Sequence, residues 1–262
     1  MRVVDKPLLL ALAAVMTLLA VQTQPAAGQR SSEIVAVTDL GAGAREAWVV
    51  LPNEPPSCLV LFLHPASAPT AADYLPWLDY LATGLSCAVI FPRYQVAARA
   101  EPVALDDLRA GISAGVVHIR RARFGFERRR ASSTLRTVVV GVGLGGSLAF
   151  YYATNARRWG LPVPAAIDSI LPSRGQIRGL PLGSLDRSTR VLVQASADPD
   201  ADREAANDLR AYLKPHPATR KRFQMIRSNP GLKATEKGTR EVSPAAVQTF
   251  WSPLDALIDG AH

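Results

Sequence analysis

The 262-residue sequence contains only two cysteines. One intrachain disulfide is therefore possible, and a scaffold held by several disulfides is excluded. Cys58 and Cys87 each begin an apolar, strand-like run, CLVLFL and CAVIF. Neighbouring parallel strands lie about 4.8 Å apart, within the reach of a disulfide. Two alternatives remain open: a bond between Cys58 and Cys87, or two buried free thiols.

Cysteine is also missing from the region that follows the N-terminal apolar run, which argues against a lipid-anchored protein. Two basic residues precede an uncharged run over residues 7–21, and small residues follow at 26–28. This pattern predicts a signal peptide over residues 1–28, cleaved before Gln29. The apolar run is short for a membrane span. We expect a secreted or periplasmic protein, associated with a membrane only if this segment stays uncleaved.

Acidic residues are outnumbered, with 22 Asp and Glu against 30 Lys and Arg, for a formal charge of +8. Aromatic residues make up only 6% of the chain, and Phe124 and Phe126 alone interleave the densest basic cluster. A nucleic-acid partner is therefore not expected. The cluster is interpreted as a solvated surface or as a site for an anionic envelope partner. Its members are Arg120, Arg121, Arg123, Arg128, Arg129 and Arg130.

Apolar runs with strand and helix periodicity alternate along the chain. Strands are predicted at residues 33–38, 46–52, 58–64, 87–91, 137–140, 165–171, 191–195 and 223–226. Helices are predicted at 71–84, 102–123, 146–157, 201–213 and 244–259. This order predicts an α/β fold: a mostly parallel central sheet with an N-terminal antiparallel hairpin and helices on both faces. Residues 29–262 then form a single domain, with 172–189 as a candidate lid and 227–243 irregular.

The segment TVVVGVGLGGSLA (residues 137–149) reads as a strand, a glycine-rich turn and a helix start. Together with LFLHPAS (61–67) and IFPRYQ (90–95), it resembles the α/β-hydrolases. That family carries a serine in a G-x-S-x-G turn, followed along the chain by an acid and a histidine. The resemblance implies the α/β-hydrolase fold and an ancestry in ester or amide hydrolysis.

The catalytic positions of that family are degenerate in this chain. Gly143 matches the nucleophile, and Asp198 matches the acid, with Asp200 as an alternative. The histidine should follow the strand at 223–226, where the sequence RSNPGLKATEKGTREVSP contains none. The chain's histidines lie elsewhere, at His64, His118, His216 and His262.

The oxyanion loop is also altered, because Pro65 stands where relatives carry glycine and proline has no N–H to donate. The N–H of Leu144 at the helix start can still favour an anion. Ser67 and Ser173 are candidates for a displaced nucleophile, and neither has an evident base in the sequence. Ser147 is expected below the pocket as a helix-packing residue. The candidate binding residues are His64, Pro65, Ser67, Val142, Leu144 and Ser173.

Metal and cofactor chemistry have little support in the sequence. The acidic run ADPDAD (197–202) lacks the glycine and the closing glutamate of a calcium loop. GVGLGG (141–146) has the wrong glycine spacing for a dinucleotide. We therefore expect no metal and no cofactor.

The leading hypothesis is an exported, non-catalytic homologue of serine esterases and lipases that binds a small acyl-type ligand or a protein or envelope partner. Two alternatives remain. One is an ester or amide hydrolase with a displaced serine. The other is an envelope interaction protein that uses the arginine-rich surface.

Overall fold

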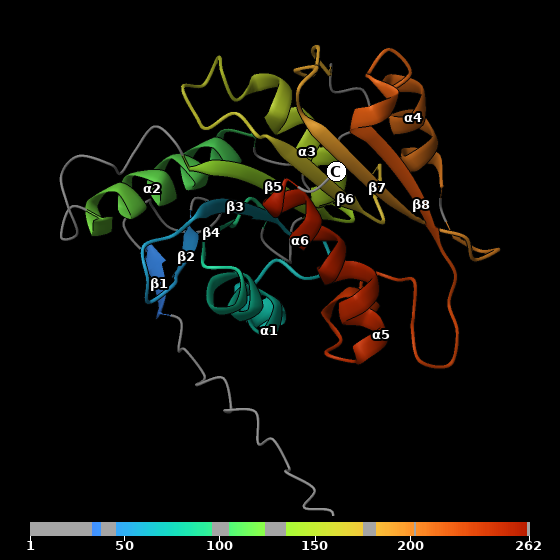
Figure 1. Ribbon diagram of the computed structural model, residues 1–262, viewed down its shortest axis with the longest axis horizontal. Helices are drawn as coiled ribbons and strands as arrows, with labels where there is room; N and C mark the ends of the chain where they lie inside the picture. The colour runs from blue at the N-terminus through green and yellow to red at the C-terminus, as the bar shows by residue number, and fades with distance from the viewer. Residues whose placement is uncertain are drawn as a thin grey trace, which may run out of the picture.

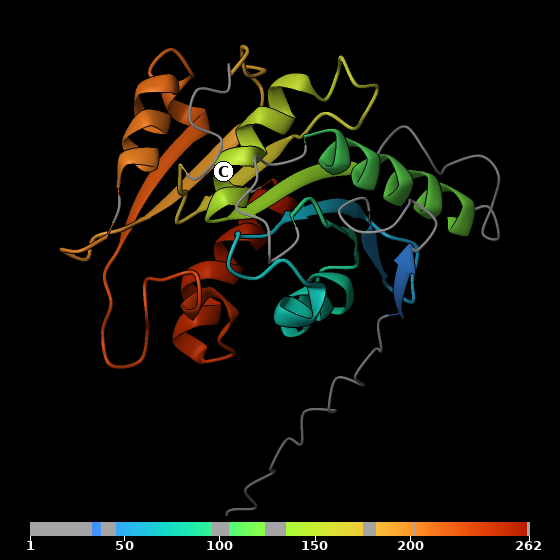
Figure 2. The same cartoon turned by 180° about the vertical axis from the view of Figure 1, so that it is seen from behind.

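The computed structural model describes residues 33–37, 46–95, 105–123, 135–174, 182–201 and 203–260. The predicted signal peptide, the turn of the predicted hairpin and part of the arginine-rich cluster lie outside these residues. The described chain forms one eight-stranded sheet in the order β1-β2-β4-β3-β5-β6-β7-β8. Helices cover both faces of the sheet (Figures 1 and 2).

The sheet is mostly parallel, as the alternation of strands and helices predicted. Antiparallel pairing is limited to β1 with β2 and β2 with β4, and all other neighbours run parallel. The strands are β1 (Glu33–Val37), β2 (Ala47–Leu51), β3 (Cys58–Leu63), β4 (Cys87–Pro92), β5 (Arg136–Val142), β6 (Ala166–Ile170), β7 (Arg190–Ser196) and β8 (Lys221–Ile226).

Two hydrophobic layers hold the helices against the sheet. One face is covered by α2 (Leu105–Arg123), α3 (Leu144–Asn155) and α4 (Glu204–Tyr212). The other is covered by α1 (Leu75–Asp79), α5 (Pro244–Ala246) and α6 (Ser252–Asp259). Strands β3 and β4 are buried along their whole length. Continuous apolar runs are typical of strands covered on both faces, which explains why these two were recognisable in the sequence.

The C-terminal helix predicted over residues 244–259 is divided into three parts. A π turn, Val247–Trp251, separates α5 from α6. Pro253 lies in the first turn of α6. Proline cannot donate the backbone hydrogen bond that would continue a regular helix, so the division falls where Pro253 removes a donor. The predicted helix over 71–84 is likewise divided, into a 3-10 turn, α1 and a π turn.

Cys58 and Cys87 are direct register partners on β3 and β4, and they form a disulfide with a Cα–Cα distance of 4.6 Å. Of the two alternatives that the sequence left open, the structure contains the bond and not the free thiols. A disulfide is consistent with an oxidising, extracellular environment. Within the described residues, no helix is long and apolar enough to cross a membrane.

Candidate functional site

The turn between β5 and α3 has the backbone that the glycine pattern predicted. Gly143 has φ 57° and ψ −118°, a conformation that side chains disfavour. A Cβ atom on Gly141 would lie 2.1 Å from the Gly145 oxygen, and one on Gly145 would lie 2.0 Å from the Leu63 oxygen. Only glycine fits at these two positions. The turn is therefore built as a nucleophile elbow, although it carries no nucleophile.

The position of the missing nucleophile is filled by Glu236. An ideal Cβ atom placed on Gly143 would lie 2.0 Å from Glu236 Oε1 and 2.9 Å from Pro65 Cβ. The other carboxylate oxygen, Oε2, accepts a hydrogen bond of 2.6 Å from the hydroxyl of Ser67. The carboxylate thus stands beside the N-terminus of α3, where the helix dipole favours negative charge. A side chain at position 143 and Glu236 cannot occupy this space together.

Glu236 belongs to the segment after β8, which in hydrolases supplies the histidine. The carboxylate of Asp198 holds the start of this segment, accepting hydrogen bonds from the Ser228 N–H (2.9 Å) and hydroxyl (2.5 Å). These bonds lower the pKa of Asp198 below its usual value. The Ser228 hydroxyl in turn accepts from the N–H of Ala234 at 2.8 Å. Asp198, which the sequence matched to the acid of the hydrolases, thus orients a serine and a loop.

The same segment is also held on the C-terminal side of Glu236, by contacts of Thr239 and Arg240. The Thr239 hydroxyl donates to the Glu236 carbonyl oxygen at 2.7 Å, and the Trp251 indole donates to the Thr239 carbonyl oxygen at 3.1 Å. Arg240 forms a 3.2 Å ion pair with Asp73. These contacts join the segment to the core, so the position of Glu236 is set by several independent bonds.

None of the three described histidines is hydrogen-bonded to Ser67, Ser173 or Glu236, and His118 lies on α2. The ring of His64 is fully buried and stacks on Tyr94 at 4.0 Å and on Phe91 at 5.3 Å. Its Nδ1 contacts the Pro65 carbonyl oxygen at 2.9 Å, so Nδ1 carries the proton of the neutral ring. Burial lowers the pKa of His64 to about 4, and the ring is neutral at physiological pH. His216 bonds to the Thr189 carbonyl oxygen at the opposite edge of the sheet.

The candidate binding residues separate into two groups. The side chains of His64, Val142 and Leu144 lie in the hydrophobic core and do not line the cavity at the site. The other three, Pro65, Ser67 and Ser173, lie around Glu236 or line the cavity. Leu144 is the first residue of α3, so its N–H has no acceptor within the helix.

Ser147 and the backbone of Ser173 support the elbow. Ser147, expected to pack below the pocket, is buried and donates to the Ser173 carbonyl oxygen at 2.9 Å. The N–H of Ser173 donates to the Gly143 carbonyl oxygen at 3.0 Å. Ser147 therefore holds the backbone of residue 173, and its hydroxyl already has a partner.

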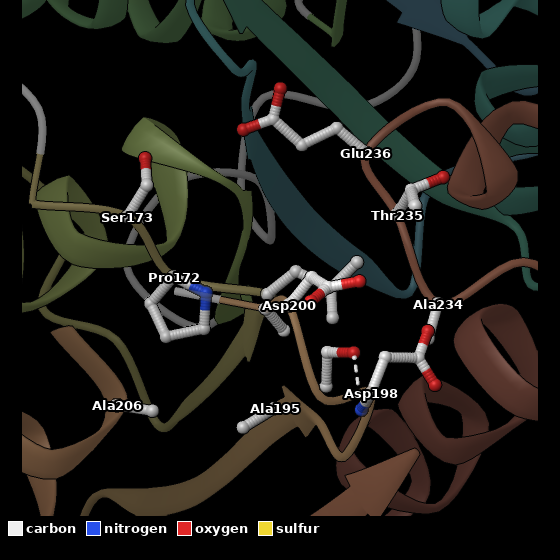
Figure 3. A pocket seen from close by; sticks show the side chains of 12 residues that line it. Pro172, Ser173, Ala195, Asp198, Asp200, Ala206, Ala234, Thr235 and Glu236 are labelled. Atoms are coloured by element: carbon white, nitrogen blue, oxygen red, sulfur yellow. Dashed lines mark hydrogen bonds between the residues drawn. The ribbon is translucent and has the colours of Figure 1, made fainter. Parts of the chain in front are cut away.

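A cavity of about 370 Å³ opens beside Glu236, at the carboxyl ends of β6 and β7 (Figure 3). Its acidic lining residues are Asp198, Asp200 and Glu236, and none of the described lining residues is cationic. The remaining lining residues are small or apolar: Leu171, Pro172, Ser173, Ala195, Ser196, Ala201, Ala206, Ala234 and Thr235. Ligands of open α/β sheets bind at this edge, so the cavity stands where a substrate would.

Sequence reasoning missed Glu236 and Ser228. Both lie in the irregular segment 227–243, where no periodicity indicates which side chain faces the elbow. The sequence of this segment indicated only that the expected histidine is absent. Across the described residues, no three His, Cys, Asp or Glu side chains are arranged to hold a metal ion.

No protein-family model and no curated protein matches the sequence. Solved structures do match. Carboxyl esterase 2 from the fungus Tuber melanosporum has a TM-score of 0.64 at 14% identity, over 90% of each chain. Dienelactone hydrolase from Anabaena variabilis has a TM-score of 0.56 at 16% identity, over 88% of this chain and 98% of its own. An esterase from Pseudomonas putida has a TM-score of 0.58 at 13% identity, over 88% of this chain and 82% of its own. With an elbow between β5 and α3 and a cavity at the carboxyl ends of the strands, this chain adopts the α/β-hydrolase fold.

Proposed function

We propose that this protein is an exported, non-catalytic member of the α/β-hydrolase fold that binds a small, neutral acyl-type ligand in the cavity beside Gly143. The observation that carries the proposal is the Glu236 carboxylate at the position of the nucleophile. In hydrolases the segment after β8 supplies the histidine base. Here it supplies the Glu236 carboxylate, which occupies the space beside Gly143 and leaves the neighbouring cavity open.

The groups that acyl transfer needs, namely a nucleophile, a base and a full set of oxyanion donors, are not found together at this site. Gly143 offers no hydroxyl to attack a carbonyl, and no described histidine stands by to accept a proton. Pro65 removes a donor from the oxyanion loop. In enzymes with a serine triad, loss of the serine or the histidine alone lowers kcat on the order of 10⁶-fold. Binding requires none of these groups, because it depends only on the cavity and its polar lining.

The lining favours a neutral ligand over a fatty-acid anion. The carboxylates of Asp198, Asp200 and Glu236 would repel a free carboxylate. Small side chains such as Ala195 and Ala206 leave room for a short acyl chain. The hydroxyl of Ser173 can donate a hydrogen bond to an ester or amide carbonyl.

The proposal is tested by titrating the mature protein with ethyl butyrate and, in parallel, with butyrate, followed by ¹⁵N-resolved chemical shifts. We expect saturable shifts around residues 195–206 and 234–236 with the ester, much weaker shifts with butyrate, and the ester recovered intact. Thr235→Trp should block the cavity, whereas Lys237→Trp, exposed on the same segment and outside the cavity lining, should bind as the unmodified protein does. Absence of saturable shifts, or hydrolysis of the ester, would contradict the proposal.

A second candidate function rests on one contact. The Ser67 hydroxyl donates to a carboxylate oxygen of Glu236 at 2.6 Å, so Ser67 has an acceptor for its proton that the sequence did not reveal. In that case Ser67 would be a displaced nucleophile and Glu236 its general base. A fluorophosphonate would then label Ser67, and Glu236→Gln would abolish the labelling. An unlabelled protein rules this candidate out.

A further inference from the structure

A second cavity lies at the amino-terminal ends of the strands, between the first residues of β7 and β8 and helix α6. Its volume is about 330 Å³. It is lined by Arg190, Val191, Leu192, Thr219, Arg220, Lys221, Arg222, Pro253 and Leu257. Arg190 begins β7, whereas Asp198 follows its end, and the strand spans seven residues. At about 3.3 Å per residue, Arg190 and Asp198 lie on the order of 25 Å apart, so the two cavities open at opposite ends of β7.

Strand geometry places cations on the same face of the sheet. Arg190 and Leu192 are two residues apart on β7 and therefore point to the same side. Leu192 pairs in register with Arg222 on β8, so these side chains are neighbours. This is the face that α6 covers, because Leu192 packs in the same core cluster as Leu254 and Leu257. Arg220 directly precedes β8 and completes the rim.

Lys221 also lines the cavity, but its ammonium group is engaged elsewhere. It donates to the carbonyl oxygens of Leu213 and Lys214 at 2.6 and 3.0 Å. Besides Lys221, the cationic residues that line this cavity are Arg190, Arg220 and Arg222.

The guanidinium of Arg190 is the unusual group. Its residue is 4% exposed, and its Nη2 donates to the Leu257 carbonyl oxygen in the last turn of α6. Its Nη1 is buried and has no hydrogen-bond acceptor in the structure. A buried charge is costly unless it is paired. The ion pairs formed among the described residues include neither Arg190 nor Arg220 nor Arg222.

From this arrangement we propose that the cavity between α6, β7 and β8 is a binding site for a small phosphate monoester. Arginine binds phosphate through paired N–H donors, and a dianion balances several guanidinium groups better than a carboxylate does. A phosphate group fills only part of about 330 Å³. Leu192, Pro253 and Leu257 leave an apolar wall for the organic part of the ligand.

The test uses the mature protein at low ionic strength, titrated by calorimetry with inorganic phosphate, phenyl phosphate and acetate. We expect saturable binding of both phosphates, tighter for phenyl phosphate, and weaker binding of acetate. Arg220→Gln and Arg222→Gln should each lower the affinity for phosphate about tenfold, because each removes a charge-assisted hydrogen bond. Both side chains are exposed, so the fold should be retained.

The matched control is Arg109→Gln, which removes the same charge from an exposed position on α2, away from β7 and β8. It should leave the affinity unchanged. Absence of saturable phosphate binding, or an equal loss in Arg109→Gln, would overturn the proposal. Co-sedimentation with phosphatidylglycerol vesicles that phenyl phosphate does not reduce would also overturn it, because the basic groups would then act as a membrane-facing surface.

Discussion

Glu236 and Gly143 share one space: a carboxylate oxygen of Glu236 lies 2.0 Å from the position where a side chain at residue 143 would begin. The glycine therefore has two roles in this chain. It allows the positive φ of the elbow, and it makes room for a group delivered by the segment after β8. A side chain at residue 143 would therefore require the Glu236 carboxylate to move.

Restoring the serine should destabilise the protein without creating an enzyme. In Gly143→Ser, the new side chain must displace Glu236 and accept a disfavoured φ, which together should lower the free energy of unfolding by about 1–3 kcal/mol. Urea denaturation measures this loss. Adding Glu236→Ala should recover part of it, whereas equal stability of the single and double variants would show that the two side chains do not compete. Neither variant should hydrolyse aryl esters, because no described histidine is placed to serve as the base.

The loop network predicts that Ser228 is one of the residues that hold the segment around Glu236. Ser228→Ala removes the acceptor of the Ala234 N–H and should cost about 1 kcal/mol in the free energy of unfolding. Hydrogen exchange should also become faster over residues 228–241. Ser188→Ala, which changes an exposed serine that is also bonded to an aspartate, is the control and should leave exchange in this segment unchanged. Unchanged exchange in Ser228→Ala would show that other contacts suffice.

Buried Asp168 gives the stability a pH dependence. Burial raises its pKa to about 7, although Gln194 donates to it at 3.1 Å. Because the folded state holds this proton more tightly than the unfolded chain, the contribution of Asp168 is largest at low pH. It declines as the pH rises from about 4 through about 7. Asp168→Asn should therefore be more stable than the unmodified protein at pH 8, by about 1–4 kcal/mol, and show little gain at pH 4.

Denaturant unfolding of the two proteins across this pH range measures the difference. His64 titrates in the opposite sense, since its lowered pKa reduces stability as the pH falls below about 6.5. It is present in both proteins, so its effect cancels in their difference. A difference independent of pH would mean that Asp168 does not titrate differently on folding.

The disulfide should contribute measurably to stability. Cys58 and Cys87 are 29 residues apart, and closing a loop of that length in the unfolded chain is worth about 3–4 kcal/mol in the entropic account. Replacing both cysteines with alanine should lower the free energy of unfolding by an amount of this order. Intact mass under non-reducing conditions should be lower by two hydrogens than the reduced mass. Identical masses would show that the thiols are free.

Most of the fold could be predicted from sequence because its signals are local. Continuous apolar runs marked β3 and β4, and the glycines around residue 143 marked a sharp turn between a strand and a helix. The division of the C-terminal helix was missed because its apolar stripe continues across Pro253 while its hydrogen bonding does not. At the site, the absence of a histidine was readable. The arrival of Glu236 was not, because it depends on long-range contacts such as those of Ser228 with Asp198 and of Arg240 with Asp73.

We propose that this chain keeps the hydrolase fold without its nucleophilic chemistry. This is tested by the intact mass of the folded protein, produced from Gln29 onward, after incubation with excess fluorophosphonate. We expect an unchanged mass, because position 143 carries no hydroxyl and no described serine is hydrogen-bonded to a histidine. A stoichiometric adduct, on Ser67 or on any other serine, would contradict it.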